Sequence, residues 1–278
     1  MALLQTIDQQ DIHGIRVGRR YPGGGYGLTG SCIIYQHGDS VIDTGPANQW
    51  KFVRDYLQHY SIRQALITHY HEDHSGNAGH FHSCFGCNVL SHPEAHSHLR
   101  DGIPMNWVRR VFFGRNAQVE PASLPDQIDT GNGELQSLNL KGHSPDSMSF
   151  FDAENGRLYS GDLYVASRIA YMQREESIGG YIDSLNQALA LDFDTLCCAH
   201  RGIINDGKTA LRKKRDYIEN LAGTVEQLHQ AGKNSQQITL EILGREDMRT
   251  YLSGGLISKH NVVLSCLDYL DRASPHSQ

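Results

Sequence analysis

The stretch Thr68-His69-Tyr70-His71-Glu72-Asp73-His74-Ser75-Gly76 places three imidazoles and two carboxylates within six residues. It follows a short apolar run that we expect to be a buried strand, and loops at strand ends are common places for functional sites. In such a loop His69 and His71 can point together while Asp73 and His74 point elsewhere, so one loop can serve two ions. Imidazole and carboxylate ligands favour Zn, Fe or Mn over Ca or Mg.

Two ions need more ligands than one loop provides, and the chain offers three at other places. His143, Asp162 and His200 each come just after a run that we expect to be a strand. A single histidine in a loop is usually hydrogen-bonded or solvated. As a set, all of whose members follow strands, these residues predict a shared metal centre.

The pattern resembles the metallo-β-lactamase-fold hydrolase superfamily, over about residues 14–205. That family's H-x-H-x-D-H loop and its later His, Asp and His match the residues quoted above. The resemblance implies that His69, His71 and His143 hold one metal, that Asp73, His74 and His200 hold the other, and that Asp162 bridges the two. It also implies two divalent ions, with Zn ahead of Fe or Mn.

The stretch Ile42-Asp43-Thr44-Gly45 is similar to the family's first motif. By that resemblance Asp43 braces the metal loop without itself binding a metal. The loop reads H-x-H rather than the H-x-E of the diiron flavoprotein relatives, which disfavours a redox diiron site.

Strands and helices alternate along the first 205 residues, and the rest is helical, which indicates an α/β protein. The resemblance implies a four-layer αβ/βα sandwich with a C-terminal helical extension. We expect a catalytic domain over 1–205, with a lid or insertion near 92–130, and a helical extension over 206–278 packed on it. The expected strands are 14–18, 31–36, 40–43, 65–68, 88–91, 134–140, 147–152, 156–160 and 195–199, and the expected helices are 46–60, 77–84, 180–191, 206–231, 235–253 and 258–270.

The implied ligand count also predicts a mechanism. Three protein ligands per metal plus one shared carboxylate leave room for a bridging hydroxide, which would attack the substrate while one metal polarises its oxygen. Asp73 can also orient or receive a proton and is the predicted catalytic residue. We therefore expect a dinuclear hydrolase of an ester-like bond, with a thioester or a lactone favoured, as in the glyoxalase II and lactonase branches.

Other functions stay open at this point. A phosphodiesterase or nuclease would use the same two ions, and a mononuclear-iron sulfur dioxygenase would need chiefly His69, His71 and His143. A non-catalytic regulatory module is a further alternative. The third motif reads Gly142-His143-Ser144-Pro145-Asp146-Ser147 rather than the Thr-Pro-Gly-His-Thr form of close glyoxalase II relatives, so glutathione recognition is not implied.

Residues that could contact a small-molecule substrate are scattered along the chain. The segment 100–118 combines apolar and cationic side chains, so it either docks on the sandwich by its apolar face or caps the metal cleft. The match of the C-terminal pair to a basic region of glyoxalase II relatives is positional only. The candidates are Tyr26 in a Gly-rich loop, Trp107 and Arg109 in the segment 100–118, Tyr164, Arg168 and Tyr171 after Asp162, and Lys259 and His260 near the C-terminus.

Composition excludes several classes of protein. The net charge of -6, from 25 Lys and Arg against 31 Asp and Glu, disfavours a nucleic-acid-binding surface. No apolar run approaches the ~20 residues of a membrane span, and the first residues do not form an export signal. Six cysteines are too few for a disulfide scaffold in a chain of 278 residues. We therefore expect a cytoplasmic protein, and the sequence does not indicate its oligomeric state.

Overall fold

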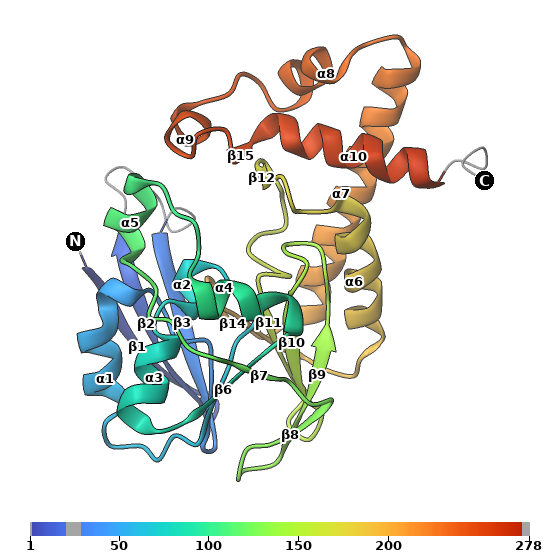
Figure 1. The fold of residues 1–278 in the computed structure, drawn as a ribbon. Coiled ribbons are helices and arrows are strands. Elements are labelled where there is room, and N and C mark those ends of the chain that lie inside the picture. Colours follow the sequence, from blue (N-terminus) through green and yellow to red (C-terminus); the bar gives the residue numbers. More distant parts are fainter. Residues whose placement is uncertain (1, 21–28, 274–278) are drawn as a thin grey trace. The chain divides into compact units, whose positions relative to one another are not determined.

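The computed structural model describes residues 2–20 and 29–273 (Figure 1). The chain divides into two units, of which unit 1 comprises Met1–Asn139, Asp146–Val165 and Phe193–Asn205. Unit 2 comprises Leu140–Pro145, Ala166–Asp192 and Asp206–Gln278. The sequence places one boundary near residue 205, whereas here α6 (Ile178–Ala190) joins the helical unit, because it packs against α7 (Gly207–Gln230).

The first sheet of unit 1 has seven strands and is mixed. Its first four strands are antiparallel, and the strands from β4 onward run parallel, so β4 and β5 end at the same edge. In sheet order the strands are β1 (Ala2–Gln9), β2 (Ile12–Arg20), β3 (Thr29–His37), β4 (Ser40–Ile42), β5 (Gln64–Leu66), β6 (Asn88–Ser91) and β7 (Ala122–Ser123).

The second sheet of unit 1 has six strands and is also mixed. Its only parallel pair is that of β11 and β13, with Gly161 opposite Cys198, so these two strands also end side by side. In sheet order the strands are β14 (Gly202–Ile204), β13 (Thr195–Cys198), β11 (Arg157–Gly161), β10 (Met148–Asp152), β9 (Glu134–Asn139) and β8 (Gln127–Asp129).

Unit 1 forms three layers, which are helices, sheet and sheet. Val53 and Leu57 of α1 and Phe81 of α3 are fully buried against one face of the first sheet, as the apolar stripe of the expected helix over 46–60 predicts. A second core, which includes Tyr35 and Phe150, fills the space between the two sheets. The helices are η2 (Ala47–Gln49), α1 (Trp50–Leu57), α2 (Glu72–Ser75), α3 (Ala78–Phe85), η3 (Pro93–Ala95), α4 (His96–Asp101) and α5 (Trp107–Phe113).

Strand β1 is not among the strands that the sequence predicts. It pairs with β2 through a two-residue turn at Gln10 and Asp11, whose φ angles are 55° and 56°. Such a turn usually contains glycine or asparagine, because most other residues rarely adopt positive φ. The turn therefore carries no clear signal in the sequence.

Unit 2 is helical. In α7 the stripe of Leu211, Ile218, Leu221 and Val225 is buried, as its spacing predicts. The expected helix over 235–253 is instead two helices with Gly244 between them, at a φ of 76°. The remaining elements are α8 (Ser235–Ile242), α9 (Met248–Leu252), α10 (Lys259–Ala273) and a short sheet of β12 (Met172–Gln173) and β15 (Ile257–Ser258).

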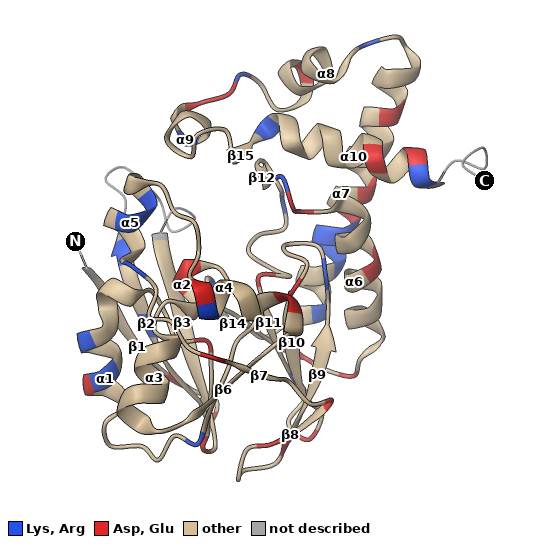
Figure 2. Cartoon of the chain, in the orientation of Figure 1, with Lys and Arg blue, Asp and Glu red and all other residues tan. Residues whose placement is uncertain are grey.

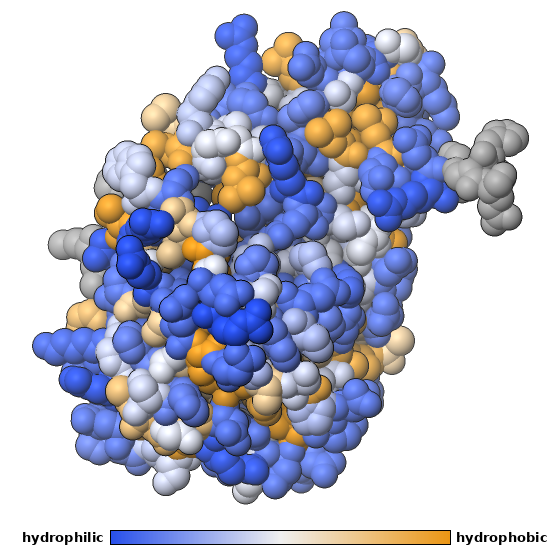
Figure 3. All heavy atoms as spheres, in the orientation of Figure 1, coloured by the Kyte–Doolittle hydropathy of each residue, from blue (hydrophilic) through white to orange (hydrophobic). Residues whose placement is uncertain are grey.

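Charged residues of both signs are interspersed along the chain (Figure 2). The face in Figure 3 is mostly hydrophilic, with apolar side chains scattered between the polar ones. Among the described residues, no helix is both long enough and apolar enough to cross a bilayer. All six cysteines belong to the described part of the chain, and all are free.

Candidate metal centre

The candidate ligands of unit 1 emerge from the ends of neighbouring strands. The histidine-rich loop begins after β5, while Asp43 follows β4, the parallel neighbour of β5. In the second sheet, Asp162 follows β11 and His200 comes shortly after β13, so the one parallel pair of this sheet brings both to the same edge. Topology therefore gathers residues that lie up to 131 positions apart in the sequence, from His69 to His200.

Asp43 organises the start of the metal loop. Its Oδ1 accepts hydrogen bonds from the backbone N–H and the hydroxyl of Thr68, both at 2.9 Å. Its Oδ2 accepts from Nδ1 of His74 at 2.7 Å. Asp43 has a φ of 65°, a conformation that a non-glycine residue keeps only where its surroundings hold it. These contacts tie Asp43 to Thr68 and His74, and its role in bracing the loop at a metal centre stays a prediction.

The rings of His74 and His200 face each other through their Nε2 atoms, which lie 3.3 Å apart. The opposite nitrogen of each ring already donates a hydrogen bond, from His74 to Asp43 and from His200 to the Ser31 carbonyl at 2.6 Å. In the neutral imidazoles both Nε2 atoms therefore carry lone pairs, which repel each other at this distance. A cation between the rings would relieve that repulsion.

Carboxylates surround the two imidazoles. Asp162 lies 3.0 Å from Nε2 of His200 and 3.5 Å from Nε2 of His74. Asp73 lies 3.9 Å from both Nε2 atoms. The ligand atoms of Asp73, His74 and His200 all lie within 4.8 Å of one another, as do those of His69, His74 and Asp162.

His69 and His71 converge in a similar way. The hydroxyl of Thr68 donates to Asp43, so its oxygen accepts from Nδ1 of His69 at 3.0 Å. This leaves the Nε2 lone pair of His69 directed at Nδ1 of His71, 3.0 Å away. The same loop therefore presents three imidazoles that could bind metal, those of His69, His71 and His74.

The electrostatics of the cluster favour positive charge. Burial by itself lowers the pKa of His74, but the buried acidic groups around it, which include the carboxylates of Asp43 and Asp162, outweigh burial and raise that pKa well above its usual range. Burial likewise opposes charge on His200, whose pKa is nevertheless raised by Asp162 and then Asp73.

The carboxylate at the centre responds in the opposite sense. Burial alone would raise the pKa of Asp73, yet His74 and His200 hold it below its usual range. The negative charge of these carboxylates favours a proton on the imidazoles, and it would equally favour a divalent cation in the same place. Nitrogen and carboxylate ligands with braced ring orientations fit a zinc-type ion.

Cys32 is a buried residue of the site that the sequence does not single out. Its Sγ lies 3.7 Å from Nδ1 of His74 and 3.9 Å from Oδ2 of Asp43. Burial raises the pKa of this thiol to about 12, so it is a neutral thiol beside the His74 imidazole. Thr68 and Ser31 are also missing from the sequence prediction, because one acts through its hydroxyl and the other through a backbone carbonyl.

His143 belongs to unit 2. There its Nδ1 lies 3.4 Å from the hydroxyl of Tyr181 and 3.4 Å from a carboxylate oxygen of Glu176. These neighbours orient the ring from within unit 2. The ligand role that the resemblance implies for His143 stays a prediction.

The described candidate substrate residues are divided between the two units. Tyr26 lies outside the described residues. In unit 1, Trp107 is 75% exposed, Arg109 is ion-paired with Glu72, and Tyr164 is half-buried.

In unit 2, Arg168 is exposed and the hydroxyl of Tyr171 bonds to the carboxylate of Asp247. Nζ of Lys259 donates to the Arg245 carbonyl at 2.8 Å, and Nε2 of His260 lies 2.9 Å from Oγ of Ser235. These contacts give Tyr171, Lys259 and His260 partners within the helical unit. Their roles toward a substrate stay predictions.

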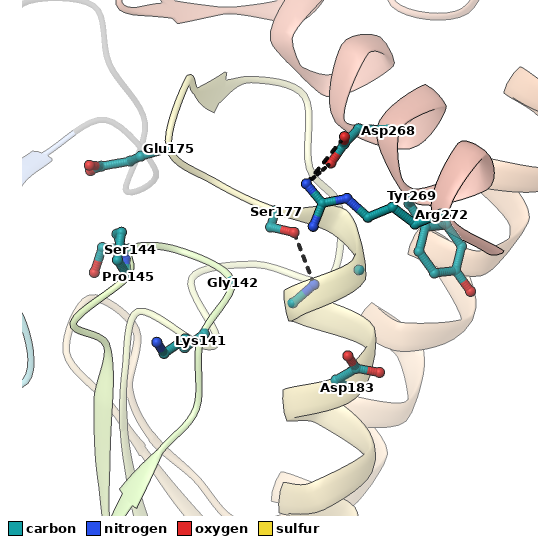
Figure 4. Close-up of a pocket in the computed structure, with 12 residues that line it drawn as sticks. Lys141, Gly142, Ser144, Pro145, Glu175, Ser177, Asp183, Asp268, Tyr269 and Arg272 are labelled. Carbon is teal, nitrogen blue, oxygen red and sulfur yellow. Dashed lines mark hydrogen bonds and ion pairs between the residues drawn. The ribbon is translucent and has the colours of Figure 1, made fainter. Parts of the chain in front are cut away.

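A cavity of about 540 Å³ lies within unit 2, beside the segment that carries His143 (Figure 4). Lys141 lines it together with Asp268 and Arg272, which form an ion pair at 3.0 Å. Ser177, at its rim, caps α6 by accepting a hydrogen bond from the Gly180 N–H at 3.1 Å. None of the described substrate candidates lines this cavity.

Comparison with known proteins identifies the family. The model of the metallo-beta-lactamase superfamily matches residues 25–200, more than half of the chain. The chain belongs to the metallo-beta-lactamase superfamily. All seven predicted ligands of this superfamily member fall within the matched range. The resemblance stated from the sequence is confirmed, as is the α/β metallo-β-lactamase fold with C-terminal helices that it implies.

Individual relatives are distant. The chain is 24% identical over 194 residues to the lactamase-like protein aptB of Emericella nidulans, covering 68% of this chain and 55% of that protein. It is 27% identical over 173 residues to a hydroxyacylglutathione hydrolase of Rhodospirillum rubrum, covering 62% of this chain and 58% of that one. The chain thus spans a little over half the length of these curated relatives.

A solved structure shows the same fold over nearly the whole chain. The crystal structure of a metallo-beta-lactamase family protein from Thermus thermophilus superposes with a TM-score of 0.70 at 19% identity, covering 94% of this chain and 93% of that chain. At this identity the likeness concerns the fold alone.

Proposed function

We propose that this protein is a metal-dependent hydrolase that cleaves an ester-like bond, with a thioester or a lactone as substrate. The observation that carries the proposal is the facing pair of Nε2 atoms of His74 and His200, 3.3 Å apart, beside the carboxylate of Asp162. In each ring the other nitrogen already donates a hydrogen bond, so two Nε2 lone pairs that face each other would not stabilise a protein core. They fit a metal ion between them.

We assign the ligands as the family resemblance implies. His69, His71 and His143 would hold one ion, Asp73, His74 and His200 the other, and Asp162 would bridge them. When bound, two zinc-type ions lower the pKa of a shared water and polarise the carbonyl of the substrate.

The chain's own residues prepare this chemistry. Asp43 and the Ser31 carbonyl fix the tautomers of His74 and His200, so both rings present Nε2 as acceptors. Asp73 is positioned 3.9 Å from both of these nitrogens, where its carboxylate can orient or receive a proton.

Two observations favour an acyl substrate over a phosphodiester. One relative is a hydroxyacylglutathione hydrolase, whose name describes a thioester substrate. The net charge of -6 opposes binding of a polyanionic nucleic acid. A small-molecule thioester or lactone is therefore the proposed substrate class.

The proposal is tested by metal analysis followed by a substrate panel. The purified chain is loaded with Zn²⁺, and kcat/KM is compared for acyl thioesters, lactones and bis-nitrophenyl phosphate. We expect the highest value for a thioester or a lactone, and a loss of that activity in Asp162→Asn. A preference for the phosphodiester would replace the proposed substrate class, and absence of turnover on all three in a zinc-loaded protein would refute hydrolysis.

A further inference from the structure

Glu72 is a buried carboxylate inside the metal loop that the predicted ligand set does not use. It stands between His71 and Asp73, and its side chain is 1% exposed. A buried carboxylate is costly unless a charged partner compensates it. The residue that pairs with Glu72 can therefore influence the two predicted ligands that flank it, His71 and Asp73.

The partner of Glu72 is Arg109, the second residue after the start of α5. Nε of Arg109 lies 2.5 Å from Oε1 of Glu72, and Nη2 lies 2.5 Å from Oε2. The Nη2 contact is a hydrogen bond, whereas Oε1 accepts none, so the pair combines one charge-assisted hydrogen bond with a second short ion contact. Figure 2 shows the acidic residues of α2 and the basic residues of α5, the two helices that this ion pair joins.

Helix α5 lies at the surface of unit 1. None of its residues is buried, and Trp107 and Val111 are 75% and 57% exposed. Near its end, the carbonyls of Val111 and Phe112 accept hydrogen bonds from Arg19 and Asn48. In its first turns, the ion pair of Arg109 connects α5 directly to Glu72 in the metal loop.

We propose that Arg109 is a positioning residue for the metal loop: by pairing with Glu72 it fixes His71 and Asp73, and metal binding in turn stabilises the docked position of α5. The two effects are linked because, if docking of α5 favours the metal-binding form of the loop, metal must favour docking by the same factor. This inference rests on the proposed metal centre. It assigns Arg109 a role other than the substrate contact that the sequence suggests.

The test is a double-mutant cycle read out as Zn²⁺ affinity by competition with a chromophoric chelator. Arg109→Ala should weaken Zn²⁺ binding by about tenfold, a typical effect of removing a group that orients a ligand. Arg110→Ala, which removes the exposed neighbouring arginine of the same helix, should change it less than about twofold. A folded Arg109→Ala protein that binds Zn²⁺ like the wild type would overturn the proposal.

The second leg of the cycle uses Glu72→Gln. If Arg109 acts through Glu72, adding Arg109→Ala to Glu72→Gln should leave the Zn²⁺ affinity within about twofold of the single variant. A further tenfold loss would show that the arginine acts on the metal by another route. This leg also decides the question if Arg109→Ala alone fails to fold, because the double variant contains no unpaired buried charge.

The motion of α5 gives an independent readout. The chain has two tryptophans, so in Trp50→Phe the emission comes from Trp107 alone, on α5. Zn²⁺ should raise the fluorescence anisotropy of Trp107 in this background and should leave it unchanged when Arg109→Ala is added. An equal rise in both would contradict the link. Neither readout uses turnover, so a protein that binds Zn²⁺ but hydrolyses nothing would refute the proposed function and leave this inference standing.

Discussion

Two buried pairs of a histidine and an aspartate in unit 1, that of His74 with Asp43 and that of His37 with Asp152, differ in what surrounds the second ring nitrogen. In the pair of His74 and Asp43, Nδ1 donates to the carboxylate and Nε2 faces another imidazole. In the pair of His37 and Asp152, Nε2 faces the carboxylate at 3.2 Å, and Nδ1 faces Oγ1 of Thr130 at 2.9 Å.

The hydroxyl of Thr130 also donates to the Gly133 carbonyl at 2.7 Å. Both ring nitrogens of His37 therefore have a hydrogen-bonding partner within the fold, one a carboxylate and the other a hydroxyl. The comparison teaches that burial beside an aspartate does not distinguish a metal ligand from a structural histidine. The surroundings of the second nitrogen do. In the closed pair of His37 this nitrogen meets the hydroxyl of Thr130, whereas in the open pair of His74 it lies beside Nε2 of His200 and the carboxylate of Asp162, a set of ligand atoms that could hold a cation.

The largest effect should follow from removing the Asp162 carboxylate, which lies beside the imidazoles of His74 and His200. Asp162→Asn should lower kcat/KM on the preferred substrate by about 1,000-fold or more, because stabilisation by the metal contributes several kcal/mol to the transition state. His37→Gln should keep the activity per folded molecule. If both variants lose activity equally, the distinction between open and closed pairs is wrong.

The closed pair should instead control stability. His37→Ala removes the imidazole that hydrogen-bonds the buried carboxylate of Asp152 and should lower the free energy of unfolding by about 3 kcal/mol. The matched control is His13→Ala, because His13 and Asp8 form a similar pair at 3.1 Å that is exposed to solvent, and its loss should cost less than about 0.5 kcal/mol. Urea unfolding measures both values. Equal losses of unfolding free energy in the two variants would show that the buried pair of His37 and Asp152 stabilises the protein no more than the exposed pair does.

An intermediate effect is expected at the aspartate that braces the open pair. Asp43→Asn replaces an obligate acceptor by an amide, so His74 is no longer held with its hydrogen on Nδ1. Zn²⁺ affinity should fall about 10- to 100-fold. Asp152→Asn, the same change in the closed pair, should leave Zn²⁺ affinity as it is, and chelator competition would detect a deviation in either variant.

The smallest effect concerns acid. Burial alone would raise the pKa of Asp152, but hydrogen bonds from His37 and Asn155 hold it below its usual range. A carboxyl whose folded pKa is lowered stabilises the protein fully above its unfolded pKa of about 3.9, and this contribution is lost as the pH falls through the folded pKa. The advantage of the wild type over Asp152→Asn should therefore be constant from pH 7 to 5 and shrink below about pH 4. A difference in unfolding free energy between the wild type and Asp152→Asn that grows on acidification would contradict this prediction.

The sequence predicts much of the fold and the places of the candidate ligands, because both depend on local patterns. Apolar runs of period two or 3.6 mark most strands and helices of unit 1 and the long helix α7. Candidate ligands that follow strand ends are visible as His69 to His74, Asp162 and His200, and in unit 1 His74 lies close to Asp73, Asp162 and His200; their metal-binding role stays a prediction.

What the sequence does not predict depends on long-range contacts. The Ser31 carbonyl orients a ring 169 residues away, and a backbone oxygen leaves no mark in the sequence. The helix of Trp107 is foreseeable from its amphipathic pattern, but the pairing of Arg109 with Glu72 is not, because nothing local says which carboxylate a surface arginine meets.

Metal stoichiometry tests the central claim most directly. The folded chain, stripped of metal and titrated with Zn²⁺ against a chromophoric chelator, should bind two ions per chain, and His200→Ala should lose one of them. A wild-type protein that stays folded and competes for no Zn²⁺ would contradict the claim that the facing imidazoles of His74 and His200 are a metal site.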